Sequence, residues 1–262
     1  MDFVPKSHYT IQDLVNIVRL LREPGGCPWD REQTHESIRK NLIEETYEVA
    51  DAIDQKDTDL LCEELGDLLL QILLHTRMEE EAGHFTFDDV CDGICKKLIY
   101  RHPHVFDARQ DLSSPQVLAN WENLKNSEKG RQSAKDRLDS VPNSLPALMR
   151  STKLQKRALD FGFTYKDANG ALDDLESEVA ELKEAIRLGR EIDHEMGDVL
   201  FSAVNVSREL HADAEEVLSQ SANRFADRVK RVEELAQRDG LDPTQLSEEQ
   251  LDAYWREAKA QE

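Results

Sequence analysis

The chain has 262 residues, of which 33% are charged, and its formal net charge at pH 7 is −21. This negative charge argues against nucleic acid or an anionic membrane surface as the main partner, because like charges repel. The sequence has no apolar run of about 18 residues that would span a membrane, and residues 1–9 lack a secretory-signal pattern. We therefore expect a cytoplasmic protein with reduced thiols at its four cysteines.

Helical patterns fill the first half of the chain. A capping box at Thr10 and Asp13 opens a helix that runs to about Arg22, and residues 27–30 then read as a loop. Apolar periodicity predicts helices over residues 36–55, 59–82, 86–101 and 114–127, and Thr86 with Asp89 forms a second predicted capping box. Glycine and proline are sparse, whereas Glu, Leu and Ala are frequent, which is typical of an all-α protein.

The second half repeats this organisation after a break. Residues 128–143 are charged and nearly devoid of apolar side chains, which is typical of a linker. Helices are then predicted over residues 147–161, 172–188, 192–210, 213–237 and 247–255. The sequence thus predicts two tandem helical-bundle domains, residues 1–127 and 144–262, joined by the linker 128–143.

Paired acids stand out in the first half. Glu45 and Glu48 are three residues apart on one predicted helix, and Glu64 and Asp67 are three apart on the next. Residues with this spacing share one helix face, so two helices packed side by side would bring the four carboxylates together. Asp67 also interrupts the apolar run 65–74, where an ionised carboxylate is costly unless it is paired or binds a cation. Oxygen donors in this arrangement suit a hard cation such as Mg²⁺.

The acid pairs recur in the second half. Glu178 and Glu181 are followed by Glu195 and Asp198, 131–133 residues after their counterparts. A single Glu-x-x-Glu in such a charged chain is usually a solvated helix face. Its recurrence with the same Gly-Asp-apolar continuation favours a functional site.

Both halves also repeat cationic and aromatic positions downstream of the acids. Each set has two cations one helical turn apart, followed by a tryptophan with a lysine four residues later. The first set is Lys97, Arg101, Trp121 and Lys125, and the second is Arg224, Arg228, Trp255 and Lys259. Each pair alone is more typical of surface charge or a core aromatic. In this repeated order the cations suit phosphate oxygens and the indole suits a nucleobase.

These motifs resemble the MazG-type, all-α nucleoside triphosphate pyrophosphohydrolases. The first half carries the EExxE…ExxD pattern from Glu44 to Asp67, and residues 26–30, 33–34, 101–106 and 144–148 resemble further stretches of the family. The resemblance spans nearly the whole chain. It implies a homodimeric enzyme that hydrolyses nucleoside triphosphates to monophosphates and pyrophosphate with Mg²⁺, for which Mn²⁺ is a possible substitute. A tryptophan stack tolerates any base, so broad specificity and a nucleotide-pool role are expected.

The resemblance also implies roles for individual residues. The metal ligands of the first domain would be Glu45, Glu48, Glu64 and Asp67. The catalytic and metal-binding acids of the second would be Glu178, Glu181, Glu195 and Asp198. Nucleotide binding would fall to Arg224, Arg228, Trp255 and Lys259, with Lys97, Arg101, Trp121 and Lys125 as first-domain counterparts.

The second acid motif departs from the family pattern. Ser177 occupies the position of the first motif Glu, and Glu176 lies on roughly the far side of the helix. Asp173 and Asp174 stand where the family places basic residues. Whether both domains are active is therefore left open.

Two alternatives remain at this point. A di-iron carboxylate bundle would need Glu-x-x-His pairs, and the chain offers Glu81 with His84 and Glu191 with His194, away from the acid pairs. A helical interaction protein with an acidic face would have no activity. Release of pyrophosphate from a nucleotide would distinguish the proposed enzyme from both.

Overall fold

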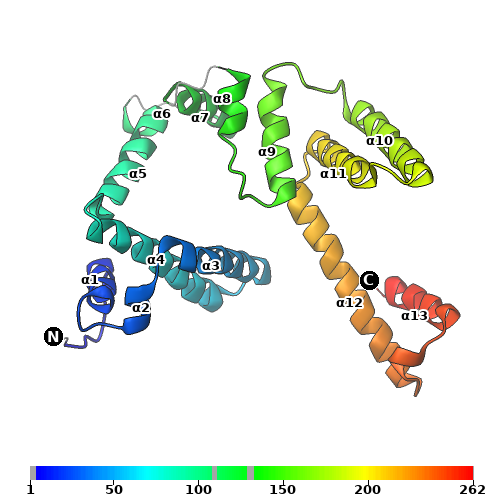
Figure 1. Cartoon of the computed structure of the whole chain (residues 1–262), viewed down its shortest axis with the longest axis horizontal. Helices are drawn as coiled ribbons and strands as arrows, with labels where there is room; N and C mark the ends of the chain where they lie inside the picture. Colours follow the sequence, from blue (N-terminus) through cyan, green and yellow to red (C-terminus); the bar gives the residue numbers. More distant parts are fainter. Residues whose placement is uncertain (1–3, 108–110, 129–132, 262) are drawn as a thin grey trace. The chain divides into compact units, whose positions relative to one another are not determined.

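The computed structural model describes residues 4–107, 111–128 and 133–261, and in these ranges the chain consists of helices, turns and loops without any strand (Figure 1). The predicted all-α class is confirmed. By its internal contacts the chain divides into two compact units, residues 1–125 and 126–262. Among the described residues, no helix combines the length and apolar character that a membrane crossing requires.

The first unit is built around a pair of long helices. Its elements are α1 (Ile11–Arg22), α2 (Pro28–Glu32), α3 (His35–Gln55), α4 (Thr58–Glu81), α5 (Phe87–Arg101), α6 (Pro103–Phe106) and α7 (Ser114–Glu128). The capping boxes at Thr10 and Thr86 form as predicted. A loop was expected over residues 27–30, but residues 28–32 form the one-turn helix α2, because Pro28 at its first position presets the helical φ angle.

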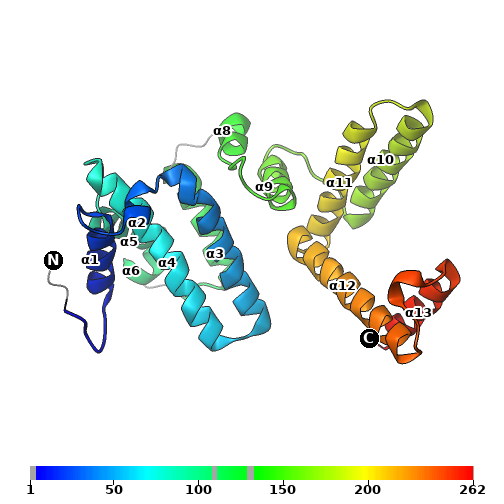
Figure 2. The same ribbon diagram turned by 60° about the horizontal axis from the view of Figure 1, so that its bottom comes forward.

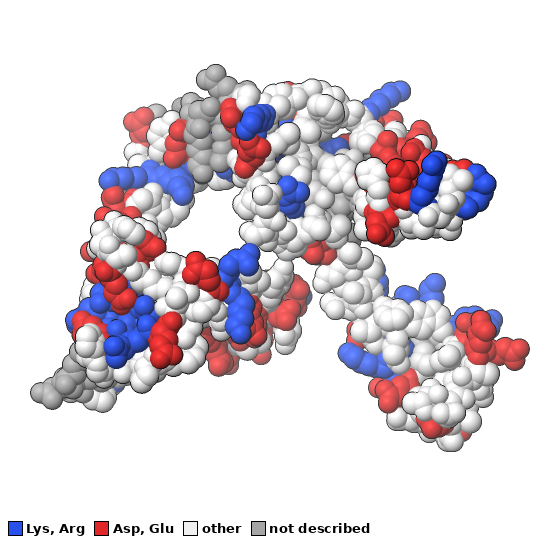
Figure 3. Space-filling model, viewed as in Figure 1, with Lys and Arg blue, Asp and Glu red and all other residues white. Residues whose placement is uncertain are grey.

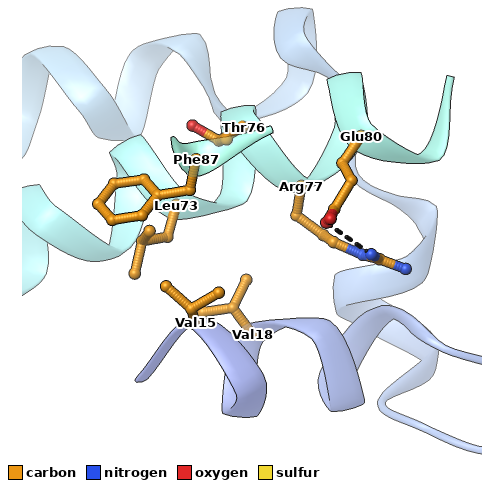
Figure 4. A pocket seen from close by; sticks show the side chains of 7 residues that line it. All are labelled: Val15, Val18, Leu73, Thr76, Arg77, Glu80 and Phe87. Carbon is orange, nitrogen blue, oxygen red and sulfur yellow. Dashed lines mark hydrogen bonds and ion pairs between the residues drawn. The ribbon is translucent and has the colours of Figure 1, made fainter. Parts of the chain in front are cut away.

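The core of the first unit lies along the second half of α4. Val18 of α1 and Ile38 of α3 pack against Leu73, Leu74 and Met78. Figure 4 shows a small pocket beside this core, where Val15, Val18, Leu73 and Phe87 meet and the Arg77–Glu80 ion pair forms one edge at 2.7 Å. All core residues of α4 follow Asp67 in sequence. The C-terminal half of α4 therefore packs in the core, and its N-terminal half carries the acids Glu64 and Asp67.

The second unit repeats the long helical pair and adds a second helix pair. Its elements are α8 (Ala134–Asp139), α9 (Ala147–Leu159), α10 (Ala168–Leu188), α11 (Ile192–Glu209), α12 (Ala214–Arg238), the 3₁₀ helix η1 (Pro243–Gln245) and α13 (Glu248–Ala260). Figures 1 and 2 both show α10 beside α11, and α13 folds back onto α12. α10 begins before the predicted residue 172 because the Asp167 side chain caps it by accepting two backbone N–H bonds.

Residues 129–132 of the predicted linker lie outside the described residues, whereas residues 133–143 contain structure of their own. Ser133 and Asp136 form a capping box that opens α8, and α8 packs against α9. Val141, which follows α8, is buried.

Candidate metal and nucleotide site

α3 and α4 bring three carboxylates of the first unit to one place. Glu45 and Glu48 project from α3 and Glu64 from α4, with one oxygen of each within 4.8 Å of the others. The charge of Asp67 also acts on Glu45 and Glu64. Three of the four acids predicted from sequence therefore lie together, and the fourth interacts with two of them.

The carboxylates of the first acid group lie close together although their negative charges repel one another. Burial, a hydrogen bond with Glu48 and the charge of Asp67 raise the pKa of Glu45. Burial and the charges of Glu48 and Asp67 raise the pKa of Glu64. The buried Gln71, one turn beyond Asp67, donates from Nε2 to Glu45 Oε1 at 3.4 Å.

α10 and α11 reproduce this geometry in the second unit. Glu178, Glu181 and Glu195 each place a carboxylate oxygen within 4.8 Å of the others. Burial is the largest cause of the raised pKa of Glu178, followed by the charges of Glu181 and Asp198. Figure 3 shows acidic side chains gathered over these two helices.

The distances between the carboxylate oxygens of each group, and the oxygen donors themselves, fit a hard cation. Mg²⁺ takes six oxygens at about 2.1 Å, so oxygens around it lie about 3–4 Å apart. Carboxylate oxygens within 4.8 Å of one another need only small movements to reach that sphere. Burial is the largest cause of the raised pKa values of Glu45 and Glu178, and the charges of the neighbouring acids, which a cation would offset, raise these pKa values further.

The surroundings of the second acid group differ from those of the first. Asp174, one turn before Glu178, accepts hydrogen bonds from Tyr165 Oη at 2.8 Å and Ser202 Oγ at 3.0 Å. Burial and this bond to Asp174 raise the pKa of Tyr165 to about 12. Ser177, in the position of the missing motif Glu, donates weakly to Glu181 at 3.5 Å. The charge of Asp174 thus adds to that of the four acids.

The cationic and aromatic residues form separate groups. In the second unit the Arg228 guanidinium lies 5.5 Å from the Trp255 ring centre, and Phe225 packs against the same ring at 5.6 Å. Arg224 bonds Ser221 at 2.6 Å, and Lys259 is exposed. In the described part of the chain, α13 packs on α12 and not on α10 or α11.

The counterpart in the first unit surrounds Trp121. Arg101 and Lys125 lie 5.3 Å and 4.5 Å from the centre of the Trp121 ring. Lys97 is exposed. In both units an arginine stacks on the predicted tryptophan.

The Glu-x-x-His pairs of the di-iron alternative have other partners. Glu81 pairs with Arg22 at 2.9 Å and also with Arg77, whereas His84 bonds Glu79 at 2.6 Å. His194 lies 3.5 Å from Asp198, four residues later on α11. The contacts of Gln71, Tyr165 and Ser202 with the acids were not predicted, since only tertiary packing brings these three residues to the acids.

A comparison with known protein families matches the same domain to both acid groups. The profile of the MazG nucleotide pyrophosphohydrolase domain matches residues 33–106 and again residues 169–233, and each match contains one complete acid group. The chain belongs to the MazG family. The second match ends before Trp255, so the matched residues include Arg228 but not its stacking partner.

MazG relatives extend the likeness over the whole chain. The nucleoside triphosphate pyrophosphohydrolase/pyrophosphatase MazG of Thermotoga maritima is 44% identical, with 95% of both chains covered. The nucleoside triphosphate pyrophosphohydrolase of Escherichia coli K12 is 40% identical over 96% of this chain and 98% of its own. The uncharacterized protein YabN of Bacillus subtilis is 43% identical over 94% of this chain but 51% of its own length.

Proposed function

We propose that this MazG-family chain hydrolyses nucleoside triphosphates to nucleoside monophosphates and pyrophosphate in a Mg²⁺-dependent reaction. The observation that carries the proposal is the acid group of α10 and α11, which lies inside a region matched by the family profile. The equivalent group of α3 and α4 is proposed as a second cation site. The names of the relatives from Thermotoga maritima and Escherichia coli agree with this reaction.

The carboxylates have two tasks in this mechanism. Glu178, Glu181, Glu195 and Asp198 would hold the cation. Bound Mg²⁺ would supply charge neutralisation for the triphosphate and a lowered pKa for attacking water, and Mn²⁺ is a possible substitute. A carboxylate of the group accepts the proton as water oxygen bonds to the α-phosphorus. The bond from that phosphorus to the bridging oxygen breaks, and pyrophosphate leaves.

The cationic group is proposed to bind the nucleotide. Arg228 lies over one side of Trp255, so a nucleobase stacked near the indole would have a cation within reach of its phosphates. Arg224 and Lys259 add positive charge nearby on α12 and α13. An indole face stacks with any base, which supports broad base tolerance. We propose nucleotide-pool control in the cytoplasm as the physiological role.

A second copy of the chain is proposed to complete the site. Ile192, Met196 and Leu200 form a stripe at four-residue spacing on α11, and each is at least 40% exposed. Contiguous apolar surface of this kind marks protein interfaces. Among the described residues, α13 does not pack on α10 or α11. In a homodimer, the nucleotide-binding residues of one copy would lie beside the acid group of the other copy.

The test is product analysis in ¹⁸O-labelled water. The purified chain is incubated with a panel of nucleoside triphosphates and Mg²⁺, and products are followed by ³¹P NMR. We expect pyrophosphate and a monophosphate that carries the ¹⁸O, as attack at the α-phosphorus requires. Asp198→Asn should abolish turnover by the second site. Orthophosphate with diphosphate would refute attack at this position, and absence of any product would favour the non-enzymatic alternative.

A further inference from the structure

Gln71 of α4 lies between the first acid group and the apolar core of its unit. It is the first buried residue of α4 in chain order, with 6% of its surface exposed, and it comes one turn after Asp67. Leu73, Leu74 and Met78, which follow it, belong to the core. A polar side chain at this depth is costly unless its polar atoms are paired, so each atom of the amide needs a partner.

The Gln71 amide is directed toward the acids. Its Nε2 donates to Glu45 Oε1 across the two helices at 3.4 Å. Helical side chains lean toward the N-terminus of their helix, which for α4 is the direction of Asp67 and Glu64. The amide oxygen is about 2.2 Å from Nε2, as the bond lengths of an amide require. Gln71 Oε1 is therefore held at the same edge of the acid group.

This amide oxygen needs a donor from outside the protein. Gln71 Oε1 is buried and has no protein partner among the described residues. Reversing the amide would turn Oε1 toward the Glu45 carboxylate and leave Nε2 as the buried atom without a partner. Ionised carboxylates accept hydrogen bonds and do not donate them, so the neighbouring acids cannot supply the proton. A bound water can.

Gln155 in the second unit shows that burial alone does not identify that water. Its Oε1 is also buried without a protein partner, but its Nε2 donates to the carbonyl oxygen of Phe201 at 2.8 Å and not to an acid. An isolated water suits Gln155. Gln71 differs because it contacts a proposed cation ligand. Bound Mg²⁺ usually keeps several waters, and each directs its protons away from the cation toward acceptors around the site.

We propose that Gln71 is a positioning residue of the first cation site. Its Nε2 orients Glu45, and its Oε1 accepts a hydrogen bond from a water in the first coordination shell of the cation. The inference rests on the proposed function, which gives the first acid group its cation. Partners of this kind orient metal ligands from outside the coordination shell, and their loss typically weakens metal binding about ten- to a hundredfold.

The second unit lacks this residue. The position 131 residues after Gln71 is occupied by Ser202, which is also buried. Ser202 offers no amide, and its hydroxyl donates to Asp174 at 3.0 Å. The proposed contact with a shell water is thus a property of the first unit, and the two cation sites should differ in how firmly they hold that water.

Mn²⁺ titration of the full chain tests the effect on affinity. Glu195→Gln in the second unit is included throughout, so that binding reports on the first site. Gln71→Met has a similar length but no atom to hold Glu45 or the water, and it should weaken Mn²⁺ affinity about tenfold. An unchanged affinity would refute the positioning role. Absence of Mn²⁺ binding before Gln71 is changed would refute the proposed cation site itself.

The residence time of water on bound Mn²⁺ tests the contact directly. It is measured by ¹⁷O NMR of the solvent at saturating Mn²⁺, so a difference in affinity does not enter. Gln71→Met should shorten the residence time of the longest-held water severalfold, because that water loses its acceptor. Gln71→Glu keeps an acceptor oxygen at the same reach and should retain a long residence time. A residence time that is the same in Gln71→Met as with Gln71 present would overturn the proposal.

Stability measurements separate this role from support of the fold. Replacing a buried, incompletely paired amide by an apolar group of similar size is close to neutral, so Gln71→Met should not melt below the parent in EDTA. Thr76→Val is the matched control. It removes another buried polar group of α4, whose Oγ1 donates to the carbonyl oxygen of Ile72 in the same helix. Its Mn²⁺ affinity should be unchanged. A loss as large as that of Gln71→Met would assign the effect to packing of α4 and refute the positioning role.

Discussion

Neutralising one acid of the second group should stabilise the metal-free protein and weaken its response to Mg²⁺. The perturbation is Glu178→Gln, which keeps the size and hydrogen-bonding reach of the side chain while removing its charge. Glu178 lies within 4.8 Å of Glu181 and Glu195. The repulsion among these charges is what the substitution relieves.

The magnitude follows from the separation of the charges. Two unit charges 4.8 Å apart repel by about 0.9 kcal/mol in water and about 3.5 kcal/mol at an effective dielectric constant near 20. Glu181 is exposed, so the value for water is the better guide. Two such pairs, less screening by salt, give a gain of about 1.5 kcal/mol, or about 3–6 °C in the melting temperature of the second unit.

The assay is calorimetric unfolding in EDTA and in saturating Mg²⁺. In EDTA the variant should melt above the parent. In Mg²⁺ at a hundred times its Kd the parent gains about 2.7 kcal/mol, most of which the variant loses, so their order reverses. Glu176→Gln is the matched control, since this exposed residue lies two positions away on α10 and outside the acid group. A Glu178→Gln protein that melts below the parent in EDTA would refute the repulsion argument.

The same variant has a defined pH dependence. Burial and the neighbouring acids raise the pKa of Glu178 in the folded protein above its ordinary value of 4.5. The folded state therefore binds more protons than the unfolded state between these two pKa values, and stability falls as pH rises through that window. The advantage of Glu178→Gln in EDTA should be complete at neutral pH and should shrink as pH falls to 4.5.

Two further predictions concern the nucleotide and the dimer. Arg228→Gln should raise KM for a nucleoside triphosphate about tenfold while Mg²⁺ binding is retained, because a charge-assisted phosphate contact is lost; steady-state kinetics with an unchanged KM would contradict this assignment. Leu200→Glu should convert the proposed dimer to a monomer in sedimentation equilibrium, since it places a charge in the exposed apolar stripe of α11. A variant that sediments as the parent does would exclude that surface as the interface.

The long helices and two of their capping boxes were predictable because their signals are local. A capping box needs only two residues three positions apart, and those at Thr10 and Thr86 formed as expected. The short helices α2 and α8 were not predicted, since isolated helices of one or two turns are marginal in water. Their stability comes from elsewhere in the chain: Arg22 bonds the carbonyl oxygen of Asp30 in α2, and Arg137 of α8 pairs with Asp160.

The convergence of the acids was predictable for a similar reason. An i, i+3 spacing fixes two carboxylates on one helix face, and the repeated pattern indicated which two helices would pair. The residues that support the acids carry no such signal. Tyr165 belongs to the loop before α10, and its bond to Asp174 exists only because the chain turns back there. No spacing rule would have selected Gln71 from the other polar residues of α4.

The two acid groups have the same types of proposed ligand residue, but the helical turns next to them differ in sequence. In the first unit the neutral Gln71 amide contacts Glu45, and the residue one turn before Glu45 is the uncharged Asn41. In the second, the residue one turn before Glu178 is the anion Asp174, held by Tyr165 and Ser202. Cation chemistry fixes the identity of the ligands in both, but it leaves the adjacent turn free to change. Because an added anion strengthens attraction for a cation and opposes a triphosphate, two sites with the same acids are expected to differ in metal affinity and in nucleotide binding.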